Sequence, residues 1–356
     1  MSRLPREICD HIVNLLHGKP ETLKACCLVS KSWVPCARKH LFSEVAFRSL
    51  NDLKAWEETF PDPANSPACY TRSLFIACAQ DVLTAAVGEG SWIDEFSGVV
   101  RLSVLSVPAH EACSASQLIK LVCSLPLLED LDVAGQVVDD HKDDDTITQV
   151  STSPPLTGTL KLDVRQGMEA ITRQLLELPD GIRFRTLKCK WNLGRDDPLW
   201  TVATMEACSG TLESIDIDSA KLWYARVGSV DFSKTTRLKE VVFRLGGTLD
   251  VQIDIALKTL TSKHRDLQRV SIHIPIRAPS IDDPVNISQA IRGAVDKQWM
   301  DLDRALIRLW ETNAIPTQVI YTTEEGKEEG REYIGGMLPE VTKRGILEVV
   351  DGRDLV

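Results

Sequence analysis

Residues 127–133 read LLEDLDV, a short run in which apolar and acidic residues alternate. In an extended chain, Leu131 and Val133 point to one face, and Asp130 and Asp132 point to the other. This alternation is typical of a strand that has one buried face. Similar runs recur along the chain, so this one predicts a single unit of a structural repeat.

Eight such runs follow one another at nearly constant spacing. Successive central residues lie 28, 29, 29, 27, 28, 26 and 29 positions apart, at Leu74, Leu102, Leu131, Leu160, Leu187, Ile215, Val241 and Val270. Helix-like segments lie between several of them, at 116–125, 169–178 and 253–263. A strand, a loop, a helix and a second loop that leads back to the next strand form the unit of a leucine-rich-repeat solenoid. Each unit is stable only when it is stacked on its neighbours.

The predicted fold class is therefore α/β, with a curved parallel sheet inside and helices outside. The repeats are irregular, because the Asn that usually follows the strand is missing. Strands about 4.8 Å apart would give a sheet roughly 35 Å long, enough for a folded protein partner. A shift of one residue in register would turn every outward side chain inward. The candidate target-binding residues at outward positions are Asp130, Asp132, Lys161, Lys188, Lys190, Asp216, Asp218, Arg244 and His273.

The composition is that of an ordinary soluble globular protein. The chain has 356 residues, of which 43% are hydrophobic and 26% are charged, and its net charge is −10. This acidic balance argues against a nucleic-acid-binding protein. The first residues lack the apolar segment of a secretory signal, and no apolar run reaches the roughly 18 residues of a membrane span. We therefore expect an intracellular protein of the cytoplasm, the nucleus or both.

The cysteines and the known catalytic motifs give no indication of chemistry. The ten cysteines include no C-x-x-C pair, and the only half-site for zinc is His110 with Cys113. Cys26 and Cys27 point about 100° apart on a helix, so they do not converge on one metal. The sequence contains no G-x-S-x-G, no phosphate-binding loop and no G-x-G-x-x-G. We expect a non-enzymatic protein with no catalytic residue, metal or cofactor, although a hydrolase site assembled across repeats stays an alternative.

The first 45 residues carry more apolar side chains than a unit of that size can bury. Ile8, Ile12, Leu15 and Leu16 form one stripe of a first helix. A second helix is predicted from about residue 21 to a break or a kink at Pro35, and a third short helix carries Ala37, Leu41 and Phe42. Three short helices cannot remove all these side chains from water. The surplus requires a partner, which is either the rest of the chain or another protein.

Three sequence blocks in this segment resemble an F-box. They are Leu4-Pro5-x-Glu7-Ile8, LVSKSW at 28–33, and Leu41-Phe42, in the order and spacing of the expanded F-box families of mushroom-type (basidiomycete) fungi. The resemblance implies docking on the Skp-type adaptor of a cullin–RING ubiquitin ligase, and through it on a cullin. The sequence does not divide the matching residues between the small core and the docking surface. The adaptor-binding residues that it implies are Leu4, Pro5, Ile8, Ile12, Leu28, Val29, Trp33, Leu41 and Phe42.

The predicted domains are an F-box at 1–48, a linking helix and loop at 49–70, irregular repeats at 71–287 and a C-terminal part at 288–356. This last part is predicted to hold a long amphipathic helix at 288–312 and a ninth strand at 317–323, which form a cap or an intermolecular contact. The acidic run at 139–145 is interpreted as a solvated loop, and binding to a basic partner is the alternative. These features predict a substrate-recognition subunit of a Skp–cullin–F-box ubiquitin ligase. A binding scaffold without a role in degradation is the alternative, and the protein target is unknown.

Overall fold

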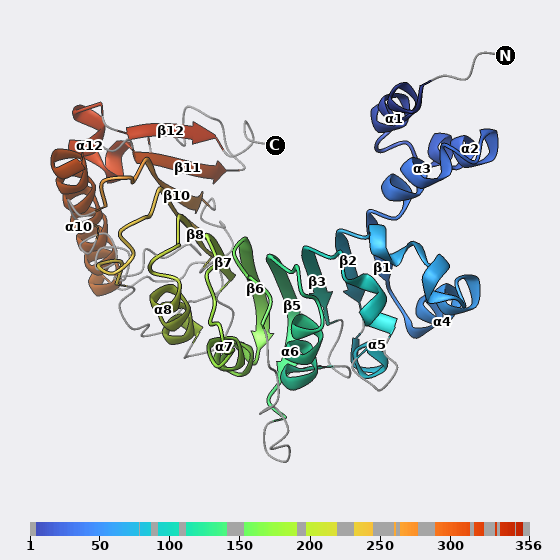
Figure 1. Ribbon diagram of the computed structural model, residues 1–356. Coiled ribbons are helices and arrows are strands. Elements are labelled where there is room, and N and C mark those ends of the chain that lie inside the picture. Colours follow the sequence, from blue (N-terminus) through green and yellow to red (C-terminus); the bar gives the residue numbers. More distant parts are fainter. Residues whose placement is uncertain are drawn as a thin grey trace, which may run out of the picture. The chain divides into compact units, whose positions relative to one another are not determined.

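The computed structural model forms two compact units. Unit one comprises Met1–Leu156 and Glu177–Gly181, and unit two comprises Thr157–Leu176 and Ile182–Val356. The structure describes residues 5–77, 79–86, 92–106, 112–140, 153–190, 197–218, 231–244, 260, 264–276, 289–313, 317–323, 332, 335–345 and 347–351. Figure 1 labels their helices and strands.

Unit one begins with three short helices, α1 (Arg6–Leu15), α2 (Pro20–Val29) and α3 (Val34–Leu41). The predicted end of the second helix was wrong, because α2 stops at Val29 and Ser30 has an extended backbone. Pro35 lies in the first turn of α3 instead. A proline is favourable there because the first N–H groups of a helix have no partner inside the helix.

Four parallel strands follow in unit one, in the order β1 (Glu44–Phe47), β2 (Ser73–Ala77), β3 (Arg101–Leu105) and β5 (Asp130–Val138). The register pairs Leu74 with Leu102 and Leu102 with Leu131, which confirms the spacing read from the sequence. The short strand β4 (Cys113–Ser114) pairs with the far end of β5. Helices α5 (Ala79–Ala86) and α6 (Ala115–Cys123) lie along these strands (Figure 1).

The strand β1 is one that the sequence analysis did not predict. Val45 pairs with Leu74, so the repeat starts one unit earlier than predicted, inside the segment 1–48. In this strand, Val45 and Phe47 are buried, whereas Glu44 and Ala46 are exposed. The apolar residues two positions apart are the sequence pattern that indicates such a strand. The predicted linking helix is confirmed as α4 (Leu50–Thr59).

The described part of unit two contains seven parallel strands in chain order. They are β6 (Thr159–Gln166), β7 (Thr186–Lys190), β8 (Ser214–Asp218), β9 (Glu240–Arg244), β10 (Arg269–Ile276), β11 (Thr317–Thr323) and β12 (Leu347–Asp351). The central apolar residues of the first five strands pair in register, as predicted: Leu160, Leu187, Ile215, Val241 and Val270. All five are almost fully buried. The predicted α/β architecture with parallel strands is thus confirmed within each unit.

Among the described residues of unit two, the helices are α7 (Met168–Leu176), α8 (Asp197–Ala207), α10 (Gln289–Asn313) and α12 (Pro339–Lys343). The long helix predicted at 288–312 is confirmed as α10, and the ninth strand is confirmed as β11. A further parallel strand that was not predicted, β12, pairs with β11. The helix predicted at 253–263 falls almost wholly outside the described residues. Buried Asp303 of α10 accepts hydrogen bonds from the backbone N–H groups of Glu340 and Val341, and so joins α10 to α12.

Backbone carbonyl groups at the strand starts join successive repeats of unit two. The carbonyl of Arg185 accepts N–H groups from Glu213 and Ser214, at 2.7 and 3.0 Å. The carbonyls of Glu213 and Lys239 each accept two N–H groups from the next repeat in the same way. Each repeat thereby fixes the register of the next through groups that any sequence supplies. No helix in the described part of the chain is long and apolar enough to cross a membrane.

Gly135 in β5 is a position at which the fold requires glycine. Its φ is +108°, and a Cβ there would overlap the carbonyl oxygen of Ser106 and lie 2.8 Å from the Ser106 Cβ. We expect Gly135→Ala to lower the free energy of unfolding by about 2 kcal/mol or more, because it adds strain and a backbone clash. Urea unfolding followed by circular dichroism measures this change.

Gly210→Ala is the matched control, because no atom lies within 4 Å of the Cβ that it would add. An unfolding midpoint for Gly135→Ala equal to that of the control would contradict the geometry described for β5.

Candidate functional site

The three N-terminal helices close around a small core of their own. Val13, Leu23, Cys26 and Ala37 are buried together in it. Partly buried side chains that pack against this core are Leu16, Cys27, Trp33, Cys36 and Leu41. Burial raises the pKa of the Cys27 thiol, so this thiol is protonated at neutral pH and is a poor nucleophile. The adjacent residues Cys26 and Cys27 therefore contribute to packing.

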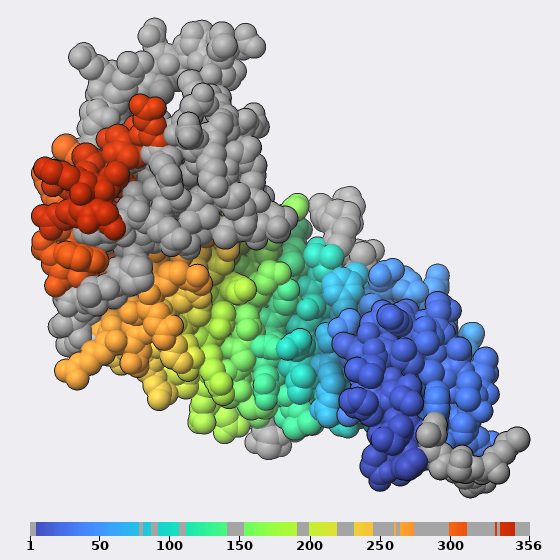
Figure 2. Space-filling view, turned by 90° about the horizontal axis from the view of Figure 1, so that it is seen from above, coloured from blue at the N-terminus to red at the C-terminus, as the bar shows by residue number. Residues whose placement is uncertain are grey.

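A second set of apolar side chains on these helices faces water. Ile8 is 48% exposed, Leu15 70%, Leu28 89% and Val29 68%. Pro5 is also exposed and Ile12 is partly exposed. We call Pro5, Ile8, Ile12, Leu15, Leu28 and Val29 the apolar face; α1–α3, which carry it, appear in dark blue in Figure 2. Leu15 was absent from the predicted adaptor-binding set, although its place in the helical stripe was the signal for it.

The remaining predicted adaptor-binding residues have internal roles, except for Leu4, which lies outside the described residues. Trp33 and Leu41 pack against the small core. Phe42 packs edge-on against Trp56 and Phe60 of the α4 region, with ring centroids 5.9 and 5.8 Å apart. These three side chains therefore support the helices and their junction with α4. The sequence did not show which residues of the pattern pack inside and which face water, and the structure separates them in this way.

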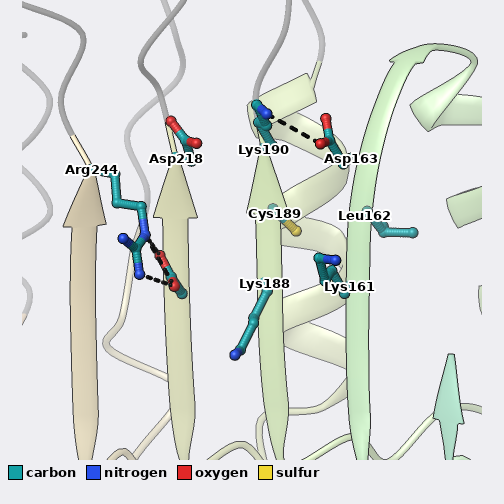
Figure 3. Close-up of a pocket in the computed structure, with 9 residues that line it drawn as sticks. Lys161, Leu162, Asp163, Lys188, Cys189, Lys190, Asp218 and Arg244 are labelled. Carbon is teal, nitrogen blue, oxygen red and sulfur yellow. Dashed lines mark hydrogen bonds and ion pairs between the residues drawn. The ribbon is translucent and has the colours of Figure 1, made fainter. Parts of the chain in front are cut away.

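A second candidate surface lies on the outward strand face of unit two, where charged side chains surround a small pocket (Figure 3). We call it the strand-face pocket; its volume is about 190 Å³. Six of the nine residues around it belong to the predicted target-binding set: Lys161, Lys188, Lys190, Asp216, Asp218 and Arg244. The other three are Leu162, Cys189 and Asp163. Asp163 was missed, although it has the same outward parity as Lys161, two residues earlier.

The strand register brings the charged side chains of the pocket into two rows. Lys161, Lys188 and Asp216 occupy one row on β6, β7 and β8. Two positions further along the strands, Lys190, Asp218, Arg244 and His273 lie side by side on β7 to β10. The sequence therefore predicted correctly which residues of these strands face outward in unit two.

Ion pairs connect the strands of the pocket. Lys190 Nζ lies 3.1 Å from a carboxylate oxygen of Asp163. The Arg244 guanidinium donates from Nε and Nη2 to the Asp216 carboxylate, each at 2.9 Å (Figure 3). The hydrogen bond to Asp216 raises the pKa of Arg244 further above its ordinary value. This two-point pairing fixes both the position and the orientation of the carboxylate.

The last predicted target-binding residues lie at other places. Asp130 and Asp132 are in unit one, on β5, and Asp130 forms an ion pair with Arg101 of β3 at 3.0 Å. His273 is beside Arg244 in unit two and does not line the pocket. Asp140, the second residue of the acidic run, accepts hydrogen bonds from Ser114 and Ser116 at the start of α6. Residues 141–145 of this run lie outside the described residues.

The described residues show no arrangement suited to metal binding, since no group of three or more His, Cys, Asp or Glu among them could hold an ion. Burial raises the pKa of Cys113 to about 12, and the pKa values of Cys123 and Cys208 to about 11. These thiols stay protonated at neutral pH, which makes them unreactive. The two surfaces described above offer non-covalent binding through apolar contact and through charge.

Comparison with known proteins finds likeness among solved structures. No protein-family model matches the chain, and no curated protein matches its sequence. Among solved structures, it is similar to the leucine-rich repeat-containing protein LegL7 from Legionella pneumophila, with 16% identity over 86% of this chain and 94% of that chain. The TM-score is 0.40, so the description of the repeats rests on the strand register alone.

The environment of His273 predicts a dependence of stability on pH. Burial lowers the pKa of the imidazole below its ordinary value, and the positive charge of Arg244 lowers it further. The unfolded chain, in which His titrates near about 6.5, then binds more protons than the folded chain. We expect stability to be complete above this pH and to fall as the pH decreases through it toward the lower folded pKa.

His273→Gln should flatten this decrease, as measured by urea unfolding between about pH 7.5 and pH 5. His11→Gln is the control, because it replaces a histidine whose side chain is exposed on α1. The prediction is wrong if the unfolding midpoint of His273→Gln follows the same pH dependence as that of the unmodified chain.

Proposed function

We propose that this chain is the substrate-recognition subunit of a Skp–cullin–F-box ubiquitin ligase, acting in the cytoplasm or the nucleus. The apolar face binds the Skp-type adaptor, and through it a cullin, while the outward strand surface binds a protein target. The chain itself makes and breaks no bonds. It raises the effective concentration of a target lysine near the ubiquitin carrier.

The observation that supports this proposal is the exposure of the apolar face. Leu28 and Val29 are 89% and 68% exposed at the end of α2, although the helices already have a closed core. Fully burying an aliphatic side chain of this kind contributes about 1.5–3 kcal/mol. Several large apolar side chains left in water on three short neighbouring helices favour an interaction site. If the helices served only as a cap, these side chains would be covered by the chain itself, and the described residues leave them exposed.

The exposed side chains also lie within the sequence blocks that resemble an F-box. Ile8 lies in the first block, and Leu28 and Val29 open the second. Trp33, Leu41 and Phe42, the later residues of the pattern, pack inside unit one. Side chains of both kinds are needed: one set holds the helices, and the other offers a surface to the adaptor.

We expect the double variant Ile8→Ser, Leu28→Ser to bind a purified Skp-type adaptor more weakly by about 2 kcal/mol or more, which is roughly a thirtyfold increase in Kd. Because both side chains are largely in water, the change should leave the stability of the helices almost unaffected. Isothermal titration calorimetry measures the affinity, and circular dichroism measures the stability.

Leu127→Ser is the matched control, since Leu127 is as exposed as Ile8, at 48%, but lies outside the three helices. Trp33→Ala is a poorer test, because it would also damage the core. Unchanged adaptor affinity in the double variant, with normal binding by the parent chain, would refute the assignment of the apolar face. A parent chain that does not bind any Skp-type adaptor would refute the F-box function itself.

A binding scaffold with no role in degradation is the second candidate, because the strand surface could hold a protein without presenting it for ubiquitin transfer. Deleting the chain from its host separates the two functions. A bound protein that accumulates after deletion supports the receptor, and one whose level is unchanged supports the scaffold. A hydrolase screen with a metal analysis of the purified protein tests the remaining enzymatic alternative.

A further inference from the structure

We propose that a rim of basic side chains at the starts of β7, β8 and β9 binds an extended acidic segment of a partner protein through the carboxylates of that segment. The inference goes beyond the proposed function, because it assigns a surface outside the strand-face pocket and does not depend on adaptor binding. We call this surface the strand-start rim. It comprises the side chains one and three positions before each of the three strands: Arg183, Arg185, Thr211, Glu213, Arg237 and Lys239.

The stacking of the repeats brings three basic side chains of the rim to one carboxylate. The backbone N–H of Glu213 donates to the carbonyl of Arg185, and that of Lys239 donates to the carbonyl of Glu213, so the three residues lie side by side. Lys239 Nζ lies 2.7 Å from a carboxylate oxygen of Glu213. This hydrogen bond lowers the pKa of Glu213 below its ordinary value, and the positive charges of Arg185 and Arg237 also lower it. The rim therefore already holds one carboxylate among three cations.

The arginines of the rim keep most of their hydrogen-bond donors for a ligand. Arg183, Arg185 and Arg237 are all exposed. Among the residues that the structure describes, the side chains of Arg183 and Arg185 form no direct ion pair and no hydrogen bond. Arg237 donates from Nη1 to the carbonyl of Gly210 at 3.1 Å, which orients the guanidinium and leaves its charge in place. The planar fork of an arginine pairs with a carboxylate at two points.

The charge of the rim is opposite to that of the whole chain. Four of its side chains are basic and one is acidic, whereas the complete sequence has 41 basic and 51 acidic residues. A locally positive surface attracts an acidic partner, and the negative charge of the rest of the chain repels the same partner from other places. Clusters of arginine are a recurring means of recognising acidic segments. Charge complementarity therefore indicates an acidic partner for this surface.

The arrangement of the charges indicates the kind of acidic ligand. Arg183 and Arg185 precede β7, Arg237 and Lys239 precede β9, and Glu213 lies between these two groups. Since neighbouring strands are about 4.8 Å apart, the two groups are separated by about 10 Å. A single phosphate cannot contact both groups, and the charge of Glu213 would repel its double charge. Two carboxylates three residues apart in an extended peptide are also separated by about 10 Å, so they fit the rim.

Peptide binding to the full chain tests this proposal. The probes are fluorescein-labelled decapeptides of Ser and Gly with Glu, Gln or Lys at every third position, a decapeptide with one phosphoserine and Gln at those positions, and an oligothymidylate of the same length. By fluorescence anisotropy in about 0.05 M salt, we expect the Glu peptide to bind about tenfold more tightly than the Gln peptide, and the Lys peptide to bind most weakly. Raising the salt concentration to about 0.5 M should remove most of this difference, because the rim is open to solvent.

Removing the carboxylate of the rim should give a gain in affinity, which loss of folding cannot produce. Glu213→Gln frees Lys239 and takes away the one negative charge of the rim, so the Glu peptide should bind about threefold more tightly. Glu311→Gln is the matched control, because Glu311 pairs with Arg344 at the same distance of 2.7 Å but lies on α10. This control should change the affinity by less than about twofold.

The arginines are tested by the double variant Arg183→Gln, Arg185→Gln, which should weaken binding of the Glu peptide about tenfold. Arg304→Gln with Arg308→Gln removes the same charge from exposed positions of α10 in the same unit. This second control should change the affinity by less than about twofold. Circular dichroism of each variant verifies that it is folded.

Any one of four outcomes would overturn the proposal. They are equal binding of the Glu and Gln peptides, tighter binding of the phosphoserine peptide or the oligothymidylate than of the Glu peptide, unchanged or weaker binding in Glu213→Gln, and an equal loss in the arginine variant and its control. Adaptor affinity enters none of these measurements. The proposed function and the assignment of the strand-start rim can therefore fail separately.

Discussion

Each strand of this chain can bury its inward side chains only when the strand of the next repeat lies beside it in register. Leu187, for example, pairs with Leu160 on one side and with Ile215 on the other, and all three are almost fully buried. None of these repeats has a core of its own, so the spacing of 26 to 29 residues is a physical requirement. The same register decides which side chains face outward, and therefore which charges can form a binding surface.

The repeats were predictable because the buried strand residues recur at a regular spacing along the sequence. The start of the repeats, the end of α2 and the choice of ion pairs depend on local contacts that this spacing does not reveal. β1 has only four residues and directly follows the helical segment, so its alternation in EVAF was too short to stand out. The missing N–H of Pro35 predicts a helix end at that residue, but the extended backbone of Ser30 ends α2 earlier. The ion pair of Arg244 with Asp216 runs diagonally between neighbouring strands, and spacing along one chain cannot specify such a choice.

The N-terminal helices illustrate a different limit of sequence reasoning. A stripe of apolar residues shows that a helix has a face to bury, but it does not show what covers that face. In α1, Val13 is buried in the small core, whereas Ile8 and Leu15 of the same short helix are in water. Only the packing of α3 against its neighbours separates them. The division also explains why Trp33, the most conspicuous aromatic side chain of the segment, supports the helices.

The two surfaces differ in the physical basis of recognition, and this difference bears on how one protein could hold two partners. Apolar contact at Leu28 and Val29 would gain affinity from the area buried and would depend little on salt. The strand-face pocket acts through charges that are exposed to solvent, where a single ion pair contributes little and salt screens it. Charge at such a surface selects among partners more than it tightens binding. The proposed recognition subunit requires a lasting contact to a common partner and a weaker, selective contact to a changing one, and two surfaces of different chemistry would supply them separately.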